Sequence, residues 1–243
     1  MTDTYPPLNT IKPVCEDVWI VDGPVIRFGP PFLKMRFPTR MTIVRLGDDK
    51  LFIHSPTAIT PALKTEVEAL GIVQWIIAPN RIHYWWIPDW KKAFDDAEVF
   101  LAPRAEEQAA GHIAVDHSNL DRAEDYPWDG ELRTISVKGS YMTEVIFFHR
   151  PSQTLILTDL IENFESHKQG SLWMQMLTWL GGVQAPHGGM PRDMRLTYPR
   201  TQLKAAVETM ISLKPERVIL AHGRWYETNG TDKLQRAFHW LLN

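Results

Sequence analysis

Three hydrophobic segments of this chain each lead into a side chain that can bind a metal ion. Residues 217–220 are followed by His222, residues 155–158 end at Asp159, and residues 76–78 precede His83. Short runs of β-branched and aliphatic residues that stop at a polar residue are typical of buried strands. Strands that run side by side end at a common edge of a sheet, so these side chains are expected to meet there. The pattern predicts a β-sheet core with a site at one edge.

The order of the expected elements divides the chain into two similar halves near residue 130. In each half, strands that form hairpins are combined with alternating helices and strands. Two sheets packed face to face, with helices outside, accommodate this order. The 243 residues are expected to form a single domain, residues 1–243, with a loop or an irregular hairpin over residues 23–38.

Charge and composition exclude several classes of function. A formal charge of −3 and an isoelectric point near 6.3, with no cluster of Lys and Arg, argue against nucleic-acid binding. No apolar stretch approaches the roughly 18 residues that span a bilayer, so no membrane association is expected. The N-terminus lacks a signal-peptide pattern and Cys15 is the one cysteine, which together predict a cytoplasmic protein without disulfides.

Five short motifs together resemble the metallo-β-lactamase-like superfamily. Residues 51–56 stand where the superfamily has a strand ending in Asp-Thr-Gly, and residues 77–83 where it has a His-x-His-x-Asp-His loop. Residues 137–140 stand where it has a Gly-His motif, residues 157–159 stand where it has Gly-Asp, and residues 221–223 match the final histidine. The resemblance indicates a divergent branch with a degenerate metal-binding motif.

The resemblance covers about residues 17–242 and implies an α/β fold, the four-layer αββα sandwich of the metallo-β-lactamase type. Residues 165–195, which are rich in Trp and Gly, are interpreted as an insertion over the sheet edge.

The motifs also depart from the superfamily pattern. The ligands of its first metal position are replaced by Asn80, Arg81 or Ile82 in the loop and by Ser140 after the central glycine. These side chains are poor zinc ligands, and that of Ile82 cannot bind a metal at all. The resemblance therefore implies that the first metal position has no ligands in this chain.

The second metal position of the superfamily retains three ligands here. His83 takes the place of the last loop histidine if the loop is about two residues shorter, and Asp159 and His222 complete the set. Two imidazoles and a carboxylate can bind one divalent ion, either zinc with a fourth place open for water, or iron or manganese. The alternative is a relic site without metal, in which Asp159 and His222 cap strand ends and hydrogen-bond each other.

Three further residues are candidates for a catalytic role. His54 ends a strand on the same side as the site, and a histidine packed between strand and loop is the alternative. Glu144 begins a strand and is a candidate general base, with a solvated strand end as the alternative. Arg81 can bind a carboxylate or phosphate of a substrate, or can be a plain surface arginine.

These features predict a metal-dependent hydrolase with a single metal ion, whose bound water attacks an ester, amide, thioester or phosphoester of a small-molecule substrate. One alternative is an inactive protein of the same fold that binds a ligand or a partner through its Trp-rich rim. Another is a non-haem iron oxidoreductase. A homo-oligomer is compatible with all three interpretations.

Overall fold

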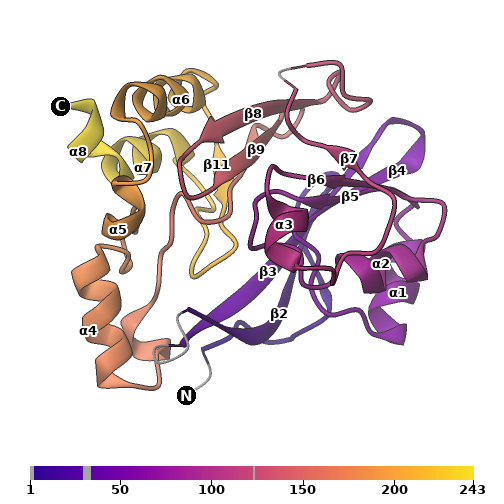
Figure 1. The fold of residues 1–243 in the computed structure, drawn as a ribbon, viewed down its shortest axis with the longest axis horizontal. Coiled ribbons are helices and arrows are strands. Elements are labelled where there is room, and N and C mark those ends of the chain that lie inside the picture. The colour runs from indigo at the N-terminus through magenta and orange to yellow at the C-terminus, as the bar shows by residue number, and fades with distance from the viewer. Residues whose placement is uncertain (1–2, 30–33, 123) are drawn as a thin grey trace.

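Two β-sheets pack face to face in the computed structural model, and helices cover their outer faces (Figure 1). The structure describes residues 3–29, 34–122 and 124–243. In Figure 1 the helices on one side come from the first half of the chain, in purple. Those on the other side come from its end, in orange and yellow. This four-layer arrangement confirms the αββα sandwich predicted from the sequence.

The first sheet is built from the N-terminal half of the chain. Its strands are β1 (Ile11–Cys15), β2 (Val18–Phe28), β3 (Met35–Leu46), β4 (Lys50–His54), β5 (Ile72–Ala78), β6 (Glu98–Leu101) and β7 (Ser118–Asn119). They lie side by side in sequence order. Neighbours from β1 to β4 are antiparallel, as hairpins require, and neighbours from β4 to β7 are parallel.

The second sheet follows residue 130 and is smaller. Its strands are β8 (Leu132–Lys138), β9 (Thr143–His149), β10 (Thr154–Ile156) and β11 (Arg217–Ile219), in the spatial order β11-β10-β9-β8. β10 is antiparallel to β9 and parallel to β11. The ends of β10 and β11 therefore lie at the same edge of the sheet.

Helices connect the strands and close the chain. The α-helices are α1 (Pro61–Glu68), α2 (Ile87–Ala93), α3 (Ala105–Ala109), α4 (Leu172–Gly181), α5 (Arg192–Arg195), α6 (Arg200–Ser212), α7 (Gly230–Ala237) and α8 (His239–Leu242). Two short 3₁₀ turns are η1 (Gly47–Asp49) and η2 (Ser166–Lys168).

Helix α1 illustrates how local sequence signals set these elements. Thr60 is the N-cap, and its hydroxyl accepts a hydrogen bond from the Leu63 backbone N–H at 3.1 Å. Pro61 follows at the first helical position, where its missing N–H costs nothing. Leu63 and Val67 lie one turn apart and are buried against the first sheet, so the helix covers this face through its apolar stripe.

Aromatic side chains fill the space between the sheets. Phe52 of β4 meets Phe147 of β9 with ring centroids 4.9 Å apart, and Trp128 packs edge-on against Phe52 at 5.0 Å. Trp75 of β5 belongs to the same buried cluster. Edge-to-face contacts of this kind stabilise a core beyond the burial of area. The two sheets therefore share one hydrophobic layer.

Two expectations about boundaries can be compared with the structure. The division near residue 130 separates the sheets, since β7 ends at Asn119 and β8 begins at Leu132. Residues 23–29 and 34–38 belong to an irregular hairpin rather than to a loop, because β2 and β3 pair through a register shift between Asp22 and Val25. Residues 30–33 of this segment lie outside the described residues.

The segment at residues 165–195 carries η2, α4 and α5. Figure 1 shows α4 at the lower left, away from both sheets. Its interpretation as an insertion in a single domain stays a prediction. Among the described residues, no helix combines the length and the apolar character needed to cross a bilayer.

Candidate metal centre

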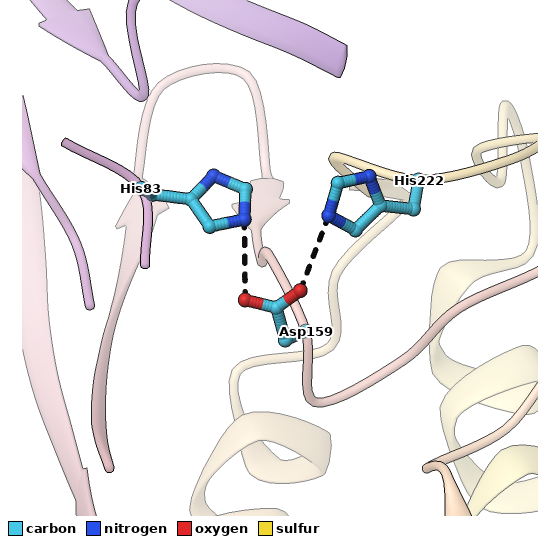
Figure 2. Close-up of side chains that lie close together, drawn as sticks. All are labelled: His83, Asp159 and His222. Carbon is cyan, nitrogen blue, oxygen red and sulfur yellow. Dashed lines mark ion pairs between the residues drawn. The ribbon is translucent and has the colours of Figure 1, made fainter. Parts of the chain in front are cut away.

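Loops at one edge of the sheets carry the three predicted ligands. His83 lies in the turn after β5, Asp159 follows β10, and His222 follows β11. Because β10 and β11 are parallel neighbours, the chain leaves both at the same edge. Figure 2 shows the two imidazole rings on either side of the Asp159 carboxylate.

The side chains of His83, Asp159 and His222 form a buried cluster. His83 Nε2 lies 3.2 Å from Asp159 Oδ2, and His222 Nε2 lies 3.2 Å from Asp159 Oδ1 (Figure 2). One ligand atom from each residue can be chosen so that all lie within 4.8 Å of one another. The structure thus brings together the three residues predicted to hold a metal ion. Metal binding by them stays a prediction.

Each histidine uses its other ring nitrogen in a hydrogen bond that orients the ring. His83 Nδ1 lies 2.6 Å from Ser55 Oγ, and His222 Nδ1 lies 2.7 Å from the Pro38 carbonyl oxygen. Histidines that ligate metal ions are usually oriented in this way, through the nitrogen that faces away from the ion. Both Nε2 atoms are therefore aimed at Asp159.

The hydrogen bond to Pro38 shows that a positive charge is needed between His222 and Asp159. A carbonyl oxygen only accepts, so Nδ1 of His222 carries a proton. In a neutral ring, Nε2 then presents a lone pair to the Asp159 carboxylate 3.2 Å away, which is unfavourable. A proton on Nε2 or a metal ion between the two groups removes this conflict. The donor set therefore fits a cation at this point.

The electrostatics of the cluster agree with this requirement. Burial lowers the pKa of His222, but the hydrogen bond and the charge of Asp159 outweigh burial and raise that pKa above its ordinary value. Burial raises the pKa of Asp159, but His83 and His222 outweigh it and hold that pKa well below its usual range. Asp159 is therefore ionised at neutral pH, as a carboxylate ligand must be.

An apolar cavity of about 650 Å³ lies beside the cluster, and His83, Asp159 and His222 form part of its wall. The aliphatic, methionine and phenylalanine side chains of the wall are Ile26, Phe28, Met35, Phe37, Ile82, Met142, Phe164, Met174, Leu177, Leu180, Val183 and Met194. Three of them, Met174, Leu177 and Leu180, belong to α4, so this helix forms part of the cavity wall. A mostly apolar chamber with a few polar groups is typical of sites for small organic molecules.

Glu144 holds the loop that carries Asp159. Its two oxygens accept the backbone N–H groups of Thr158, Asp159 and Leu160 at 2.8, 2.9 and 3.0 Å. The side chain is fully buried, and burial with the nearby Asp159 charge raises the pKa of Glu144 to about 7. The solvated strand end considered for Glu144 is therefore wrong. Its oxygens accept from backbone groups, so Glu144 positions the Asp159 loop, and its catalytic role stays a prediction.

His54 and Arg81 contact protein groups outside the His/Asp/His cluster. His54 packs edge-on against Phe147, with ring centroids 5.6 Å apart, and burial lowers its pKa to about 3, which keeps the ring neutral. The Arg81 guanidinium donates to the Tyr141 carbonyl and to the Gln108 side chain. The cavity wall, as far as the described residues define it, contains neither His54 nor Arg81. Proton transfer or substrate orientation by these two side chains stays a prediction.

The residues at the superfamily's first metal position have other partners. Ser140 Oγ donates to the Thr197 carbonyl at 3.0 Å, and Ile82 packs against the core of the second sheet. The Asn80 side chain donates to Asp159 Oδ2 and to Thr158 Oγ1, so it supports the cluster instead. Among the described residues, the His/Asp/His group alone has the spacing of a metal site.

Sequence reasoning missed two buried charged residues near the site, and the first is Arg40. Its guanidinium pairs with Asp22, with Nη2 2.7 Å from Oδ1. Nη1 donates to the carbonyl groups of Leu220 and Gly223 at 2.7 and 2.8 Å, on either side of His222. Arg40 therefore ties the His222 loop to the first sheet. No motif marks this residue in the sequence.

The second missed residue is Glu162, whose side chain lines the cavity. The residue is only 8% exposed, and its backbone is fixed by two hydrogen bonds of 3.0 Å to Gly189. Burial raises the pKa of Glu162 to about 8, although His222 opposes this shift. Its position shortly after Asp159, in the ligand loop, is the signal in the sequence that points to it.

Solved structures of known proteins define the class of fold. A metallo-β-lactamase from Pontibacter korlensis is similar over 96% of this chain and 99% of its own, with a TM-score of 0.61 and 12% identity. The metallo-β-lactamase FIM-1 from Pseudomonas aeruginosa, in its mono-zinc form, is similar over 96% of both chains, with a TM-score of 0.61 and 11% identity. The metal-soaked Flv1 flavodiiron core from Synechocystis sp. is similar over 96% of this chain and 60% of its own, with a TM-score of 0.62 and 13% identity. This chain therefore has the metallo-β-lactamase fold.

The family follows from the sequence. The model of the family described as "Domain of unknown function (DUF4336)" matches residues 31–175, which is more than half of the chain. The chain belongs to the DUF4336 family. A comparison with curated proteins found no match.

Proposed function

We propose that this protein is a metal-dependent hydrolase that uses one divalent ion, held by His83, Asp159 and His222. The supporting observation is the contact between His222 and Asp159, which requires a positive charge between an imidazole and a carboxylate. Two imidazoles and one carboxylate leave a fourth coordination place free, which is the arrangement of catalytic rather than structural zinc sites. When bound, such an ion lowers the pKa of water and so supplies a nucleophile near neutral pH.

The chain's own residues prepare the site for this chemistry. Ser55 and Pro38 hold the two rings so that both Nε2 atoms face the same point. Glu144 fixes the backbone of the Asp159 loop, so little reorganisation is needed when a ligand arrives. The apolar cavity binds the body of the substrate and keeps bulk water away. The bond to be hydrolysed, in an ester, amide, thioester or phosphoester, then lies at the cluster end of the cavity.

Metal content tests this proposal directly. We would measure zinc, iron and manganese by inductively coupled plasma mass spectrometry in tag-free wild type, Asp159→Ala and His222→Ala. The matched controls are Asp193→Ala, a carboxylate on the cavity rim, and His187→Ala, an exposed histidine outside the cluster. Circular dichroism would check that every variant folds.

The proposal predicts about one metal ion per chain in wild type and in both controls, and loss of that ion in both folded cluster variants. A wild type that holds no metal after incubation with each ion would exclude the hydrolase. It would leave a proton on His222 as the cation of the cluster. Metal retained in both cluster variants would place the ion elsewhere and would also refute the proposal.

The same donor set supports one alternative chemistry. Two histidines and a carboxylate also suit iron in oxidoreductases. Iron in the purified protein, with a colour or a redox response, would favour the oxidoreductase, and zinc would favour the hydrolase. The proposal therefore depends on which ion is found.

A second candidate function, ligand or partner binding without catalysis, is favoured by the surface of α4. Trp173 and Trp179 are 52% and 66% exposed on this helix beside the cavity. Exposed tryptophans are common anchors of protein interfaces. This candidate predicts a metal-free protein whose elution volume or tryptophan fluorescence changes when Trp173 and Trp179 become covered. The hydrolase predicts metal without such a change.

A further inference from the structure

The cavity beside the His/Asp/His cluster contains one more buried charged group. Glu162 lies in its wall and is 8% exposed, whereas the other wall residues that are buried to this degree outside the cluster are apolar or uncharged. A carboxylate enclosed by apolar side chains is costly unless a partner compensates its charge. If the protein supplies no such partner, the ligand of the cavity must carry the compensating positive charge.

No partner for this carboxylate comes from the part of the chain that the structure describes. Neither a hydrogen-bond donor nor a cationic side chain contacts its oxygens. Arg192 is the cationic wall residue outside the cluster, but it is exposed at the rim. Its Nη1 donates to the Leu180 carbonyl at the end of α4, so the guanidinium is turned toward that helix. Asp193 lies beside it at the rim and is exposed as well.

We propose that the cavity binds molecules with an apolar body and a positively charged amine, and that the ammonium group pairs with Glu162. The apolar wall, with Phe28, Phe37 and Phe164, contacts the body of the ligand. The carboxylate accepts charge-assisted hydrogen bonds from the ammonium group. This inference names the class of substrate for the proposed function. It rests on that function only in taking the bound amine to be the substrate.

The charge of Glu162 predicts that the cavity binds amines more tightly than alcohols or carboxylic acid anions. A neutral alcohol of the same shape gains the apolar contacts but leaves the carboxylate without a counter-charge. A carboxylic acid anion meets the like charge of Glu162 and is disfavoured. Burial raises the pKa of Glu162 to about 8, because the opposing charge of His222 does not offset the loss of water.

Binding of three probes of equal length tests the proposal. We would titrate octylammonium, 1-octanol and octanoate into the full chain, as purified, by isothermal titration calorimetry at about pH 9, where the amine and the Glu162 carboxyl group are both charged. The variants are Glu162→Gln, which removes the charge and keeps the shape, and the matched control Asp193→Asn at the exposed rim.

Wild type and Asp193→Asn should bind octylammonium about tenfold or more tightly than 1-octanol, and octanoate most weakly. Glu162→Gln should bind octylammonium and 1-octanol about equally. Equal binding of amine and alcohol by wild type, absence of binding by all three probes, or a preference that survives in Glu162→Gln would each overturn the proposal.

The measurement reads binding rather than turnover, so it is separate from the test of the hydrolase. His222→Ala, which is expected to lose the metal but keeps both carboxylates, should retain the amine preference. A protein without metal that still prefers the amine refutes the hydrolase and supports the amine site. A protein with metal but without the preference refutes the amine site alone.

Discussion

Replacing Arg40 with Met is expected to destabilise the protein strongly, because one buried guanidinium joins three segments. Arg40 is 3% exposed and pairs with Asp22, which is also 3% exposed. The same guanidinium satisfies the carbonyl groups of Leu220 and Gly223. Methionine keeps much of the length and volume of the side chain and removes all of these interactions, so the measured loss reports on them rather than on a cavity.

The magnitude follows from what is left unpaired. Removing one partner of a buried ion pair costs about 3–5 kcal/mol when the other charge is stranded. Here Asp22 keeps a second partner, because Lys12 Nζ lies 2.8 Å from its Oδ2, and this favours the lower end. Two buried carbonyl groups also lose their donor, at about 1 kcal/mol or more each. These contributions overlap, so they are not simply summed, and we expect a loss of about 4 kcal/mol in the free energy of unfolding. This loss corresponds to a fall of about 10 °C in Tm.

The assay is urea unfolding followed by tryptophan fluorescence, with thermal unfolding as a second readout. Arg45→Met is the matched control, because Arg45 lies on the same strand and pairs with Asp17 at a distance of 2.7 Å. That pair is about a third exposed on both sides, so its loss should cost less than about 1 kcal/mol. Similar losses in the two variants, or a loss below about 1 kcal/mol in Arg40→Met, would show that the buried network does not stabilise the fold as argued.

Two further predictions concern stability. His54 has its pKa lowered to about 3 by burial, so the native ring is neutral while the unfolded ring gains a proton below its ordinary pKa. Stability is therefore lost as pH falls from that value toward 3, by about 2 kcal/mol at pH 5, and urea unfolding across this range should show a shallower decline in His54→Phe. Gly223→Ala should destabilise the fold by several kcal/mol, since φ is +83° and a Cβ would lie 2.2 Å from the Asn163 carbonyl oxygen. A Tm within about 2 °C of wild type would contradict this.

The fold and the cluster could be predicted because their signals are local. Runs of β-branched residues identify the strands, and the residue that ends such a run must emerge at the edge of a sheet. This logic found Asp159 and His222 from the ends of β10 and β11. His83 required the resemblance as well, because it follows β5 only after a turn.

The supporting residues could not be predicted because their partners are distant in sequence. Glu144 looks like a solvated strand end until the loop at residues 158–160 is folded over it. Arg81 follows the strand that precedes the site, but the direction of its side chain depends on Tyr141 and Gln108. Arg40 lies in a strand whose sequence gives no sign that it reaches the His222 loop. Side-chain direction at a sheet edge is a tertiary property.

The cluster also links the two halves of the chain thermodynamically. His83 follows a strand of the first sheet, whereas Asp159 and His222 follow strands of the second. An ion held by all three side chains is released when either half unfolds, so its binding free energy is added to the stability of both. Loading the site should therefore raise the hydrogen-exchange protection of amides in β5 and in β11 together, although neither strand borders the other. An ion at this edge would act as a reversible cross-link between the two sheets, in addition to their shared apolar layer and to the hydrogen bonds of Arg40.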